Sequence, residues 1–424
     1  MAPFPLSLRT YRTAMSVLEP AAPMLLHRRA RRGKESLARL AERLGHPSHP
    51  RPAGQLVWIH GASVGECVAV LPLIDLLLAK PARSVLLTSG TVAAAKLMAE
   101  RLPPRAIHQF APVDTPRAVD RFLAHWRPNV AVFVDSEIWP NILMATHAAA
   151  IPLAIVNGRM TGKSFAGWSR AKGAAAKLFS LYDVALVQDE ATAQKFRTLG
   201  AHAVEISGNL KADAPALPAD QNTLDALRRQ IGARPIFLAT NTHDGEEAAL
   251  LAAHDSLKIE FPSLLTIIAP RHAERGPAIA EACGTRALAR RASGQRIDDG
   301  VEIYIADTMG ELGLFYRLAA FAFIGKSLAG HGGQNPLEAA RLGVAVLAGQ
   351  NTDNFRQAYE TIFAAQGFGR VTSTEEIVSL AARLFRAPME ARAMGATARD
   401  AILPLGGALD RTHRAIERLI SPHA

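Results

Sequence analysis

A glutamate at the end of a glycine-containing turn is the first residue whose surroundings suit catalysis. The run H-G-A-S-V-G-E, from His60 to Glu66, follows an apolar stretch that should form a strand. Gly61 and Gly65 would let a ligand approach the carboxylate, and apolar surroundings raise the pKa of a glutamate toward values that suit a general base acting on an alcohol. Ser63 and Glu66 also have the spacing of a helix capping box, so a purely structural role is the alternative.

A glycine-rich loop in the second half of the chain is the second candidate. From Phe323 to Ala340 it reads F-I-G-K-S-L-A-G-H-G-G-Q-N-P-L-E-A-A, which predicts a strand, a loop and a helix that begins at Asn335 and Pro336. Asparagine is a favoured N-cap and proline fits the first helical position, where free N–H groups and the helix dipole attract anions. The loop therefore predicts a phosphate site. Glu338 could contact the ligand, or it could only bond back to the cap.

Two further polar clusters follow apolar runs in the first half of the chain. In D-S-E-I-W-P-N, Asp135 and Glu137 resemble an acidic metal motif, but a metal site is not favoured there. In G-N-L-K, Lys211 places an ammonium group after the last strand of this half, although a loop lysine is usually only solvated.

Three clusters in the second half add groups that suit phosphate. They are T-H-D-G-E-E (242–247), A-P-R-H (269–272) and D-T-M-G-E-L (307–312). Arg271 can bind a phosphate with two parallel hydrogen bonds, and a helix beginning at Met309, Gly310 and Glu311 would offer further N–H donors. Histidines 243, 272 and 331 lack a compact metal-ligand spacing, which favours hydrogen-bonding roles over zinc. A base in one half and phosphate-binding groups in the other predict group transfer from an activated nucleotide.

Alternating strand-like and helix-like runs must position these residues. Short apolar strands separated by helices predict parallel sheets with right-handed crossovers, and ligands bind such sheets at the carboxyl ends of their strands. The segment A-D-A-P-A-L-P-A-D-Q-N (212–222) is the best candidate for a linker between two doubly wound domains that face a cleft. The predicted strands are 55–60, 84–88, 130–134, 153–156, 184–187 and 204–207, then 235–240, 264–269, 301–305, 321–324 and 344–347; helices are predicted at 67–79, 117–126 and 191–199.

Composition agrees with two packed domains. The 424 residues are 49% hydrophobic and 20% charged, which excludes wholesale disorder, and a chain of this length exceeds one ordinary core. The two cysteines, Cys67 and Cys283, form no C-x-x-C pair, so neither a disulfide framework nor a zinc site is indicated, as suits the reducing cytosol.

The N-terminal segment carries much of the positive charge. Residues 1–51 contain ten Lys and Arg against three acidic residues, within a net charge of +10. The apolar run between Arg12 and Arg28 is broken by prolines and is too short to span a bilayer, and its basic cluster follows rather than precedes it, unlike a signal peptide. We expect an in-plane anchor on an anionic membrane surface. The alternative is a nucleic-acid arm, but Tyr11 is the only aromatic residue between Phe4 and Trp58.

These motifs, in this order, resemble those of the bacterial Kdo transferases, which transfer 3-deoxy-D-manno-octulosonic acid (Kdo) from CMP-Kdo to lipid A precursor. The resemblance extends from about residue 32 to beyond residue 407 and rests on W-I-H-G-A-S-V-G-E, D-S-E-I-W-P-N, N-G-R-M, G-N-L-K-A-D, T-H-D-G-E-E, A-P-R-H-A-E-R, D-T-M-G-E-L and G-G-Q-N-P-L-E-A-A. It implies an inverting, metal-independent GT-B glycosyltransferase without a cofactor, peripheral on the cytoplasmic face of the inner membrane. It leaves open how many Kdo residues are added.

The resemblance also implies roles for individual residues. Glu66 matches the catalytic base, and Asp135 and Lys211 match groups that stabilise the transition state, although the family usually has glutamate at the position of Asp135. Lys326 and Gln334 stand where the family usually has glycine and histidine. The positions that match the CMP-binding residues are Pro270, Arg271, Met309, Gly310, Glu311, Asn335, Pro336, Leu337 and Glu338.

The resemblance assigns the segments as follows: 1–51, a membrane-associating segment with a first helix; 52–212, an acceptor-binding domain; 213–222, a linker; 223–400, a donor-binding domain; 401–424, a C-terminal helix that could pack back on the first domain. The expected partners are CMP-Kdo, lipid A precursor and an anionic membrane leaflet, with no nucleic acid. Alternatives are another glycosyltransferase or a sugar-nucleotide epimerase on the same fold, and a non-catalytic basic protein that binds through residues 1–51.

Overall fold

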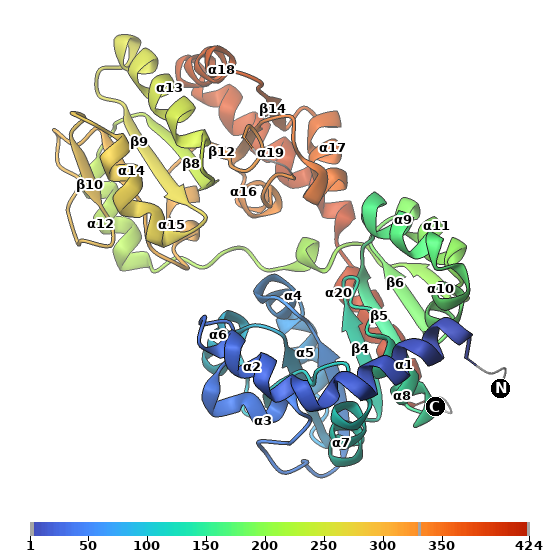
Figure 1. Ribbon diagram of the computed structural model, residues 1–424. Helices are drawn as coiled ribbons and strands as arrows, with labels where there is room; N and C mark the ends of the chain where they lie inside the picture. Colours follow the sequence, from blue (N-terminus) through green and yellow to red (C-terminus); the bar gives the residue numbers. More distant parts are fainter. Residues whose placement is uncertain (1–3, 330–331, 422–424) are drawn as a thin grey trace. The chain divides into compact units, whose positions relative to one another are not determined.

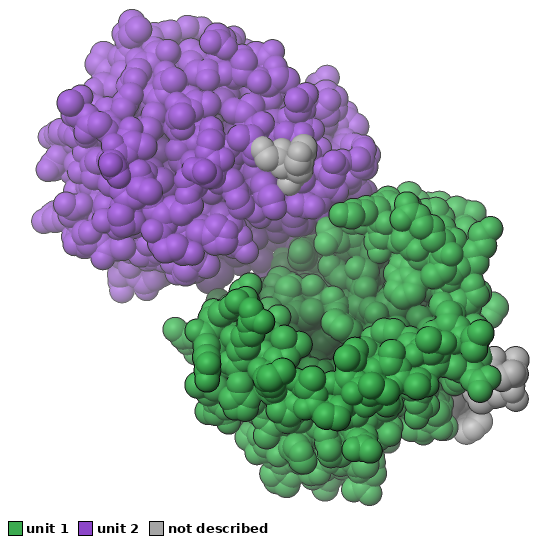
Figure 2. Space-filling view, viewed as in Figure 1, with its two compact units in different colours: residues 1–214, 406–424 green, residues 215–405 purple. Residues whose placement is uncertain are grey.

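The computed structural model describes residues 4–329 and 332–421 (Figure 1). The chain forms two compact units, coloured separately in Figure 2. Unit 1 comprises Met1–Ala214 and Gly406–Ala424, and unit 2 comprises Pro215–Leu405. Each unit contains one sheet of seven parallel strands with helices around it, so the predicted α/β class with two doubly wound parallel sheets is confirmed.

The sheet of unit 1 has the strand order β3-β2-β1-β4-β5-β6-β7. Along β1, Leu56 and Trp58 belong to one core cluster and Val57 and Ile59 to another, so both faces of the sheet are covered, as the continuous apolar strands predict. The strands are β1 (Gln55–His60), β2 (Arg83–Ser89), β3 (Ala106–Phe110), β4 (Val130–Val134), β5 (Leu153–Gly158), β6 (Val184–Val187) and β7 (Val204–Ile206).

Strand β3 was not predicted from the sequence, because its middle residues are polar. His108 and Gln109 are nevertheless buried, and the ring Nε2 of His108 lies 2.8 Å from the hydroxyl of Ser89 on the neighbouring strand. The predicted helix 67–79 is also two helices, since α4 ends at Ala69 and α5 begins at Leu71, with a proline near its start that cannot continue a helical hydrogen-bond ladder. The helices of unit 1 are α1 (Leu6–Leu18), α2 (Ala22–Ala30), α3 (Leu40–Arg43), α4 (Val64–Ala69), α5 (Leu71–Leu78), α6 (Val92–Arg101), α7 (Pro116–Trp126), α8 (Pro140–Ala148), α9 (Gly162–Arg170), α10 (Lys172–Phe179), α11 (Glu190–Thr198) and α20 (Ala408–Ile420).

The N-terminal segment is part of unit 1. Leu8 of α1 and Leu26 of α2 are buried, and Leu8 belongs to the core cluster that includes Trp126. The hydroxyl of Tyr11 donates to Asp114 Oδ2 at 2.8 Å. Asp114 also accepts from the first backbone N–H groups of α8, so α1 is connected to the start of that helix.

The C-terminal helix α20 packs on α5 in the same unit. Glu417 of α20 accepts from the ammonium of Lys80 at 2.6 Å and pairs with the guanidinium of Arg83, whose side chain is buried. Asp213 accepts from the backbone N–H groups of Gly407 and Leu409 at the start of α20. The preceding helix ends at Ile402, so residues 401–424 are not one continuous helix.

The sheet of unit 2 has the strand order β10-β11-β9-β8-β12-β13-β14. Its strands are β8 (Ile236–Thr242), β9 (Leu265–Pro270), β10 (Leu288–Arg290), β11 (Ile303–Ile305), β12 (Phe321–Ile324), β13 (Ala345–Ala348) and β14 (Phe368–Arg370). The two outermost strands were not predicted, because each has three residues and is only partly buried. The helices are α12 (Gln221–Ile231), α13 (Glu246–Glu260), α14 (Gly276–Ala282), α15 (Leu312–Tyr316), α16 (Leu337–Arg341), α17 (Arg356–Ala364), α18 (Thr374–Arg386) and α19 (Pro388–Ile402).

Candidate functional site

Glu66 lies in the first turn of α4, immediately after the carboxyl end of β1. Ser63 is the N-cap, and its hydroxyl donates to Glu66 Oε1 at 2.7 Å while the amide of Ala62 donates to Glu66 Oε2 at 2.7 Å. Glu66 therefore takes part in the helix cap and also has a half-buried carboxylate, so the structural and the catalytic interpretations do not exclude each other. Burial raises the pKa of Glu66, and the nearby carboxylates of Asp135 and Glu137 raise it further, against the hydrogen bonds from Ser63 and Ala62.

Asp135 and Glu137 lie beside Glu66 on the turn that follows β4. The strand predicted at 130–134 is β4, so both acidic residues follow it, and Asp135 adopts a left-handed backbone conformation with φ of 60°. Glu137 accepts from Trp139 Nε1 at 2.7 Å and lies 3.7 Å from His60 Nε2. Burial alone would raise the pKa of Glu137, but its hydrogen bond with His60 and the charge of that ring lower it.

Asn157 connects two of the predicted residues. Its side-chain amide donates to Asp135 Oδ1 at 2.6 Å, and its Oδ1 accepts from the backbone N–H of Leu210 at 3.0 Å. Leu210 begins a short 3-10 helix, Leu210–Asp213, which carries Lys211. Sequence reasoning did not assign a role to Asn157. The available signal was an asparagine at the end of an otherwise apolar strand.

Within the described residues 4–329 and 332–421, no cluster of three or more His, Cys, Asp or Glu side chains could hold a metal ion. At Asp135, the guanidinium Nε of Arg159 lies 3.8 Å from Oδ2. The carboxylates of Asp135 and Glu137 thus lie next to four side chains: the amide of Asn157, the imidazole of His60, the indole of Trp139 and the guanidinium of Arg159.

A small pocket in unit 2 brings four of the predicted donor-site residues together. Pro270 ends β9 and Arg271 follows it, and Met309 and Gly310 lie on the turn after β11; all four line the pocket with Asn241. Arg271 is exposed, and its backbone N–H donates to the carbonyl of Thr242 at 3.1 Å. The pocket lies at the carboxyl ends of β8 and β9, as expected for an open parallel sheet.

The carboxylate of Glu311 forms an ion pair within unit 2. It pairs with Arg291 at 2.6 Å and accepts from the hydroxyl of Thr308. The hydrogen bond from Arg291 lowers the pKa of Glu311. The helix expected at Met309 begins later, at Leu312, with Glu311 as its N-cap residue.

Residues 335–338 form the start of α16. The predicted N-cap is displaced by one position: α16 begins at Leu337, and Pro336 is its cap residue. Asn335 Oδ1 accepts from the backbone N–H of Leu337 at 3.1 Å, and the Asn335 amide donates to Glu338 Oε1 at 3.1 Å. Glu338 therefore contacts Asn335, the residue predicted to be the N-cap, through their side chains.

The first part of the glycine-rich loop before α16 contacts a carboxylate of the same unit. The amide groups of residues 326–329 donate to the carboxylate of Glu246, so this part of the loop already binds an internal anion. The phosphate site predicted from the N–H groups at the helix N-terminus does not depend on these four amides and stays a prediction. Gly330 and His331, which were part of the predicted loop, lie outside the described residues.

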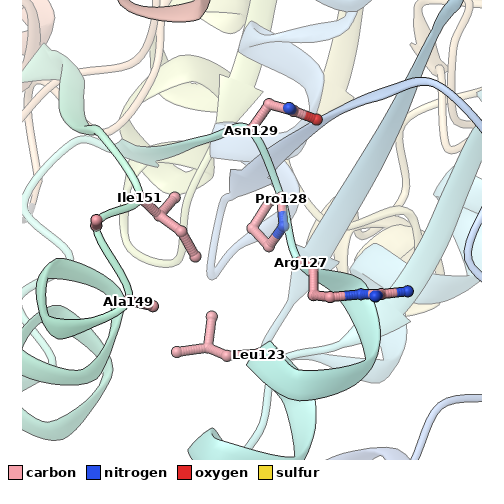
Figure 3. A pocket seen from close by; sticks show the side chains of 7 residues that line it. Leu123, Arg127, Pro128, Asn129, Ala149 and Ile151 are labelled. Atoms are coloured by element: carbon pink, nitrogen blue, oxygen red, sulfur yellow. The ribbon is translucent and has the colours of Figure 1, made fainter.

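A larger pocket in unit 1 lies away from all predicted site residues. Leu123, Ala149 and Ile151 surround the hollow in Figure 3, and the side chain of Arg127 points away from it. The lining residues precede β4 and β5, so this pocket is at the amino ends of the strands. Parallel sheets bind ligands at the other edge.

Comparison with known proteins identifies the family. Residues 38–214 match the family model for 3-deoxy-D-manno-octulosonic-acid transferase (kdotransferase). The chain is 32% identical to the 3-deoxy-D-manno-octulosonic acid transferase of Bordetella pertussis, over 96% of this chain and 98% of that protein. It is 30% identical to the Haemophilus influenzae enzyme of the same name, over 88% of this chain and 89% of that protein.

A structural relative supports the fold. The crystal structure of a glycosyltransferase from Rickettsia africae aligns with a TM-score of 0.62 at 9% identity, covering 88% of this chain and 100% of that chain. This likeness indicates a GT-B-like fold, while the sequence relatives indicate the activity. The chain belongs to the 3-deoxy-D-manno-octulosonic acid transferase family.

Proposed function

We propose that the chain transfers Kdo from CMP-Kdo to a hydroxyl group of lipid A precursor (lipid IVA), with inversion at the anomeric carbon and with Glu66 as general base. The observation that carries this proposal is the environment of Glu66. Among the residues that the structure describes, its half-buried carboxylate has two hydrogen-bond donors, and both Asp135 and Glu137 act to raise its pKa. A carboxylate with these properties can accept a proton from an alcohol as the oxygen attacks.

The reaction has one displacement step. The acceptor hydroxyl loses its proton to Glu66, its oxygen forms a bond to the anomeric carbon of Kdo, and the bond from that carbon to the phosphate oxygen of CMP breaks. Negative charge therefore develops on the departing phosphate, where cationic groups stabilise the transition state. Lys211 is proposed to stabilise this negative charge and Asp135 the positive charge that develops at the anomeric carbon, and the link through Asn157 supports the view that they act within one site.

CMP-Kdo is proposed to bind unit 2. Pro270, Arg271, Met309 and Gly310 line one pocket, and the exposed guanidinium of Arg271 suits the phosphate. The remaining proposed contacts are Glu311, Asn335, Pro336, Leu337 and Glu338. Glu338 could accept from ribose hydroxyl groups, and Glu311, which is paired with Arg291, would shape the turn that carries Met309 and Gly310.

Membrane docking through the N-terminal segment is the third part of the proposal. Val17, Leu18, Met24 and Leu25 are exposed on or beside α1 and α2, near the basic cluster at 28–32. Among the described residues, no helix is both long and apolar enough to cross a bilayer. We therefore propose peripheral association with the anionic cytoplasmic leaflet of the inner membrane.

Vesicle binding tests this docking surface. Replacing Val17 and Leu18 with serine should weaken binding to vesicles that contain anionic lipid by about tenfold, because exposed apolar area is lost from the contact. A matched control is Ile259→Ser, which removes a side chain that is 86% exposed on unit 2. Equal binding of the wild type and the double variant would contradict the assignment.

Measuring the reaction itself tests the activity. The purified protein in detergent is given CMP-Kdo with and without tetraacylated lipid A precursor, and both CMP release and the mass of the lipid are measured. We expect acceptor-dependent CMP release and a gain of one or more Kdo masses, and the number of gains gives the number of sugars added. A folded protein that releases no CMP under these conditions would contradict the proposed donor and acceptor.

A further inference from the structure

A buried glutamate in unit 2 binds the glycine-rich loop. Glu246 is the first residue of α13 and is 0% exposed. Its Oε1 accepts from three amides and its Oε2 from two. The donors are the backbone N–H groups of Ser327 (2.9 Å), Leu328 (3.0 Å) and Ala329 (3.4 Å) at Oε1, and of Lys326 (2.7 Å) and His243 (2.9 Å) at Oε2.

The arrangement is a backbone anion site filled by the protein's own side chain. Successive amide groups that point to one place form a nest that binds anions such as phosphate. The neighbouring Glu247 is different: its carboxylate pairs with Arg275 at 2.6 Å and accepts from the hydroxyl of Thr242 at 2.8 Å. Within the part of the chain that the structure describes, Glu246 has no ion pair with lysine or arginine, and backbone dipoles offset its charge.

The loop has little freedom to adopt another shape. Lys326 has a φ of 59°, in the left-handed region that is strained for a residue with a side chain. A Cβ atom at Gly325 would lie 2.3 Å from the carbonyl oxygen of Asn241, so only glycine fits there. The hydroxyl of Ser327 accepts from the backbone N–H of Gly349 at 2.8 Å. An internal anion that binds four successive amides can hold this strained segment in place.

The fixed segment leads directly to the proposed donor contacts. The carbonyl of Lys326 accepts from the N–H of Gly333 at 2.9 Å, and the carbonyl of Gly325 accepts from the N–H of Gln334 at 3.0 Å. Gln334 precedes Asn335, and its side-chain nitrogen lies 2.9 Å from His243 Nε2. The turn at residues 333–335 is thus connected to the segment that Glu246 holds.

We propose that Glu246 is a positioning residue for the donor site: its carboxylate fixes residues 326–329 and thereby preforms the turn that presents Asn335 and Glu338 to the nucleotide. This inference rests on the proposed function of unit 2. It also implies that the phosphate of the donor is held by side chains such as Arg271 and not by the amides of residues 326–329, because those amides already have an acceptor.

Glu246→Gln tests the proposal with the smallest change of shape. The amide nitrogen of glutamine cannot accept from backbone N–H groups, so one side of the nest loses its acceptor. We expect the KM for CMP-Kdo to rise about 10- to 100-fold, with kcat at saturating donor and the KM for the lipid acceptor within about threefold of wild type. Glu246→Asp retains the charge and should lie between the wild type and Glu246→Gln.

Glu247→Gln is the matched control, since it removes a buried carboxylate one residue away that does not contact the loop. Its donor KM should stay within about threefold of wild type. An unchanged donor KM in a folded Glu246→Gln protein would overturn the proposal, as would equal increases in the two variants. If Glu246→Gln does not fold, the same comparison is made with Glu246→Asp, and a wild-type donor KM there would overturn it.

Hydrogen exchange separates this inference from the proposed activity. The amides of residues 326–329 should exchange at least tenfold faster in Glu246→Gln than in the wild type, with no such change in Glu247→Gln, and this measurement needs no turnover. Unchanged exchange would overturn the positioning role. Faster exchange in a protein whose wild type does not use CMP-Kdo would contradict the proposed function alone.

Discussion

Two glutamates at corresponding places in the two sheets have opposite environments. Glu66 follows β1 in unit 1, and Glu246 follows β8 in unit 2; each lies in the first turn of the next helix. Glu66 is half-buried and accepts from one amide and one hydroxyl, with acidic neighbours. Glu246 is fully buried and accepts from five amides.

The difference shows what determines the role of a carboxylate at such a position. Hydrogen bonds to the ionised form stabilise it, so a carboxylate with many amide donors resists protonation, whereas burial with few donors and nearby negative charge favours protonation. Glu66, whose pKa is raised, can therefore act as a proton acceptor. Glu246 has the contacts of a structural residue, because its carboxylate accepts from the amides of residues 326–329.

The largest predicted effect is on turnover at Glu66. Glu66→Gln removes the proton acceptor while keeping a side chain that can accept from the amide of Ala62, so kcat should fall about 10²- to 10⁴-fold. Steady-state transfer of Kdo to lipid measures the effect, with thermal unfolding as the control for folding. Retention of full activity would show that the base is another residue.

A smaller effect is expected at Arg271, on donor binding. Arg271→Ala should raise the KM for CMP-Kdo about 10- to 100-fold, because a charge-assisted hydrogen bond to phosphate contributes about 1.5 to 3 kcal/mol. Arg229→Ala is a matched control, since Arg229 is also an exposed arginine of unit 2 but lies on α12. An unchanged donor KM at Arg271→Ala would place the phosphate elsewhere.

Glu417 extends the comparison to a carboxylate paired with side chains. The hydrogen bond from the buried guanidinium of Arg83, with help from Lys80, lowers the pKa of Glu417 to about 2. Because the folded-state pKa is depressed, this stabilisation is present above the unfolded pKa near 4.5 and is lost as the pH falls toward 2. Glu417→Gln should lower the free energy of unfolding by about 2 to 3 kcal/mol at pH 7, with Kdo transfer retained.

Thermal unfolding at pH 7 and pH 3 tests this prediction. The difference between wild type and Glu417→Gln should shrink at pH 3, where the pairing is partly lost. Glu190→Gln removes a carboxylate from a solvent-exposed pair with Arg197 and should change stability by less than about 1 kcal/mol. A wild-type unfolding temperature for Glu417→Gln at pH 7 would contradict the role of the pair in attaching α20.

The pH dependence of turnover gives the smallest but most specific effect. A general base works only when it is deprotonated, so kcat/KM should fall as the pH drops through the pKa of Glu66. Since burial and the acidic neighbours raise that pKa above its usual 4.5, the acidic limb should lie at higher pH than for an ordinary glutamate. A profile that is flat down to pH 4.5 would contradict this environment.

Much of the fold follows from the sequence, because buried parallel strands are continuous apolar runs. The exceptions have physical causes: β3 contains His108 and Gln109, whose polarity hides a buried strand, and β10 and β14 are too short to give a periodic signal. The left-handed conformation of Asp135 was likewise not predictable, because an aspartate after an apolar run is also compatible with a longer strand.

The site was only partly predictable. The environment of Glu66 was expected, because its partners Ala62 and Ser63 are within four residues in the sequence. The role of Glu246 was not expected from the sequence, because its carboxylate accepts from amides about 80 residues away. Local spacing does not indicate which anion fills a backbone nest. The role of Asn157 was also not expected from the sequence, because its two hydrogen-bond partners, Asp135 and Leu210, are distant in sequence.

The most direct test of the account measures donor binding and Kdo transfer on the same two variants. Calorimetry with CMP-Kdo and single-turnover transfer to lipid are compared for Glu66→Gln and Glu246→Gln. We predict that Glu66→Gln binds the donor with near wild-type affinity but does not transfer, and that Glu246→Gln binds the donor at least tenfold more weakly yet transfers at near the wild-type rate when the donor is saturating. Loss of the same property in both variants would contradict the division between a proton acceptor in unit 1 and a structural anion in unit 2.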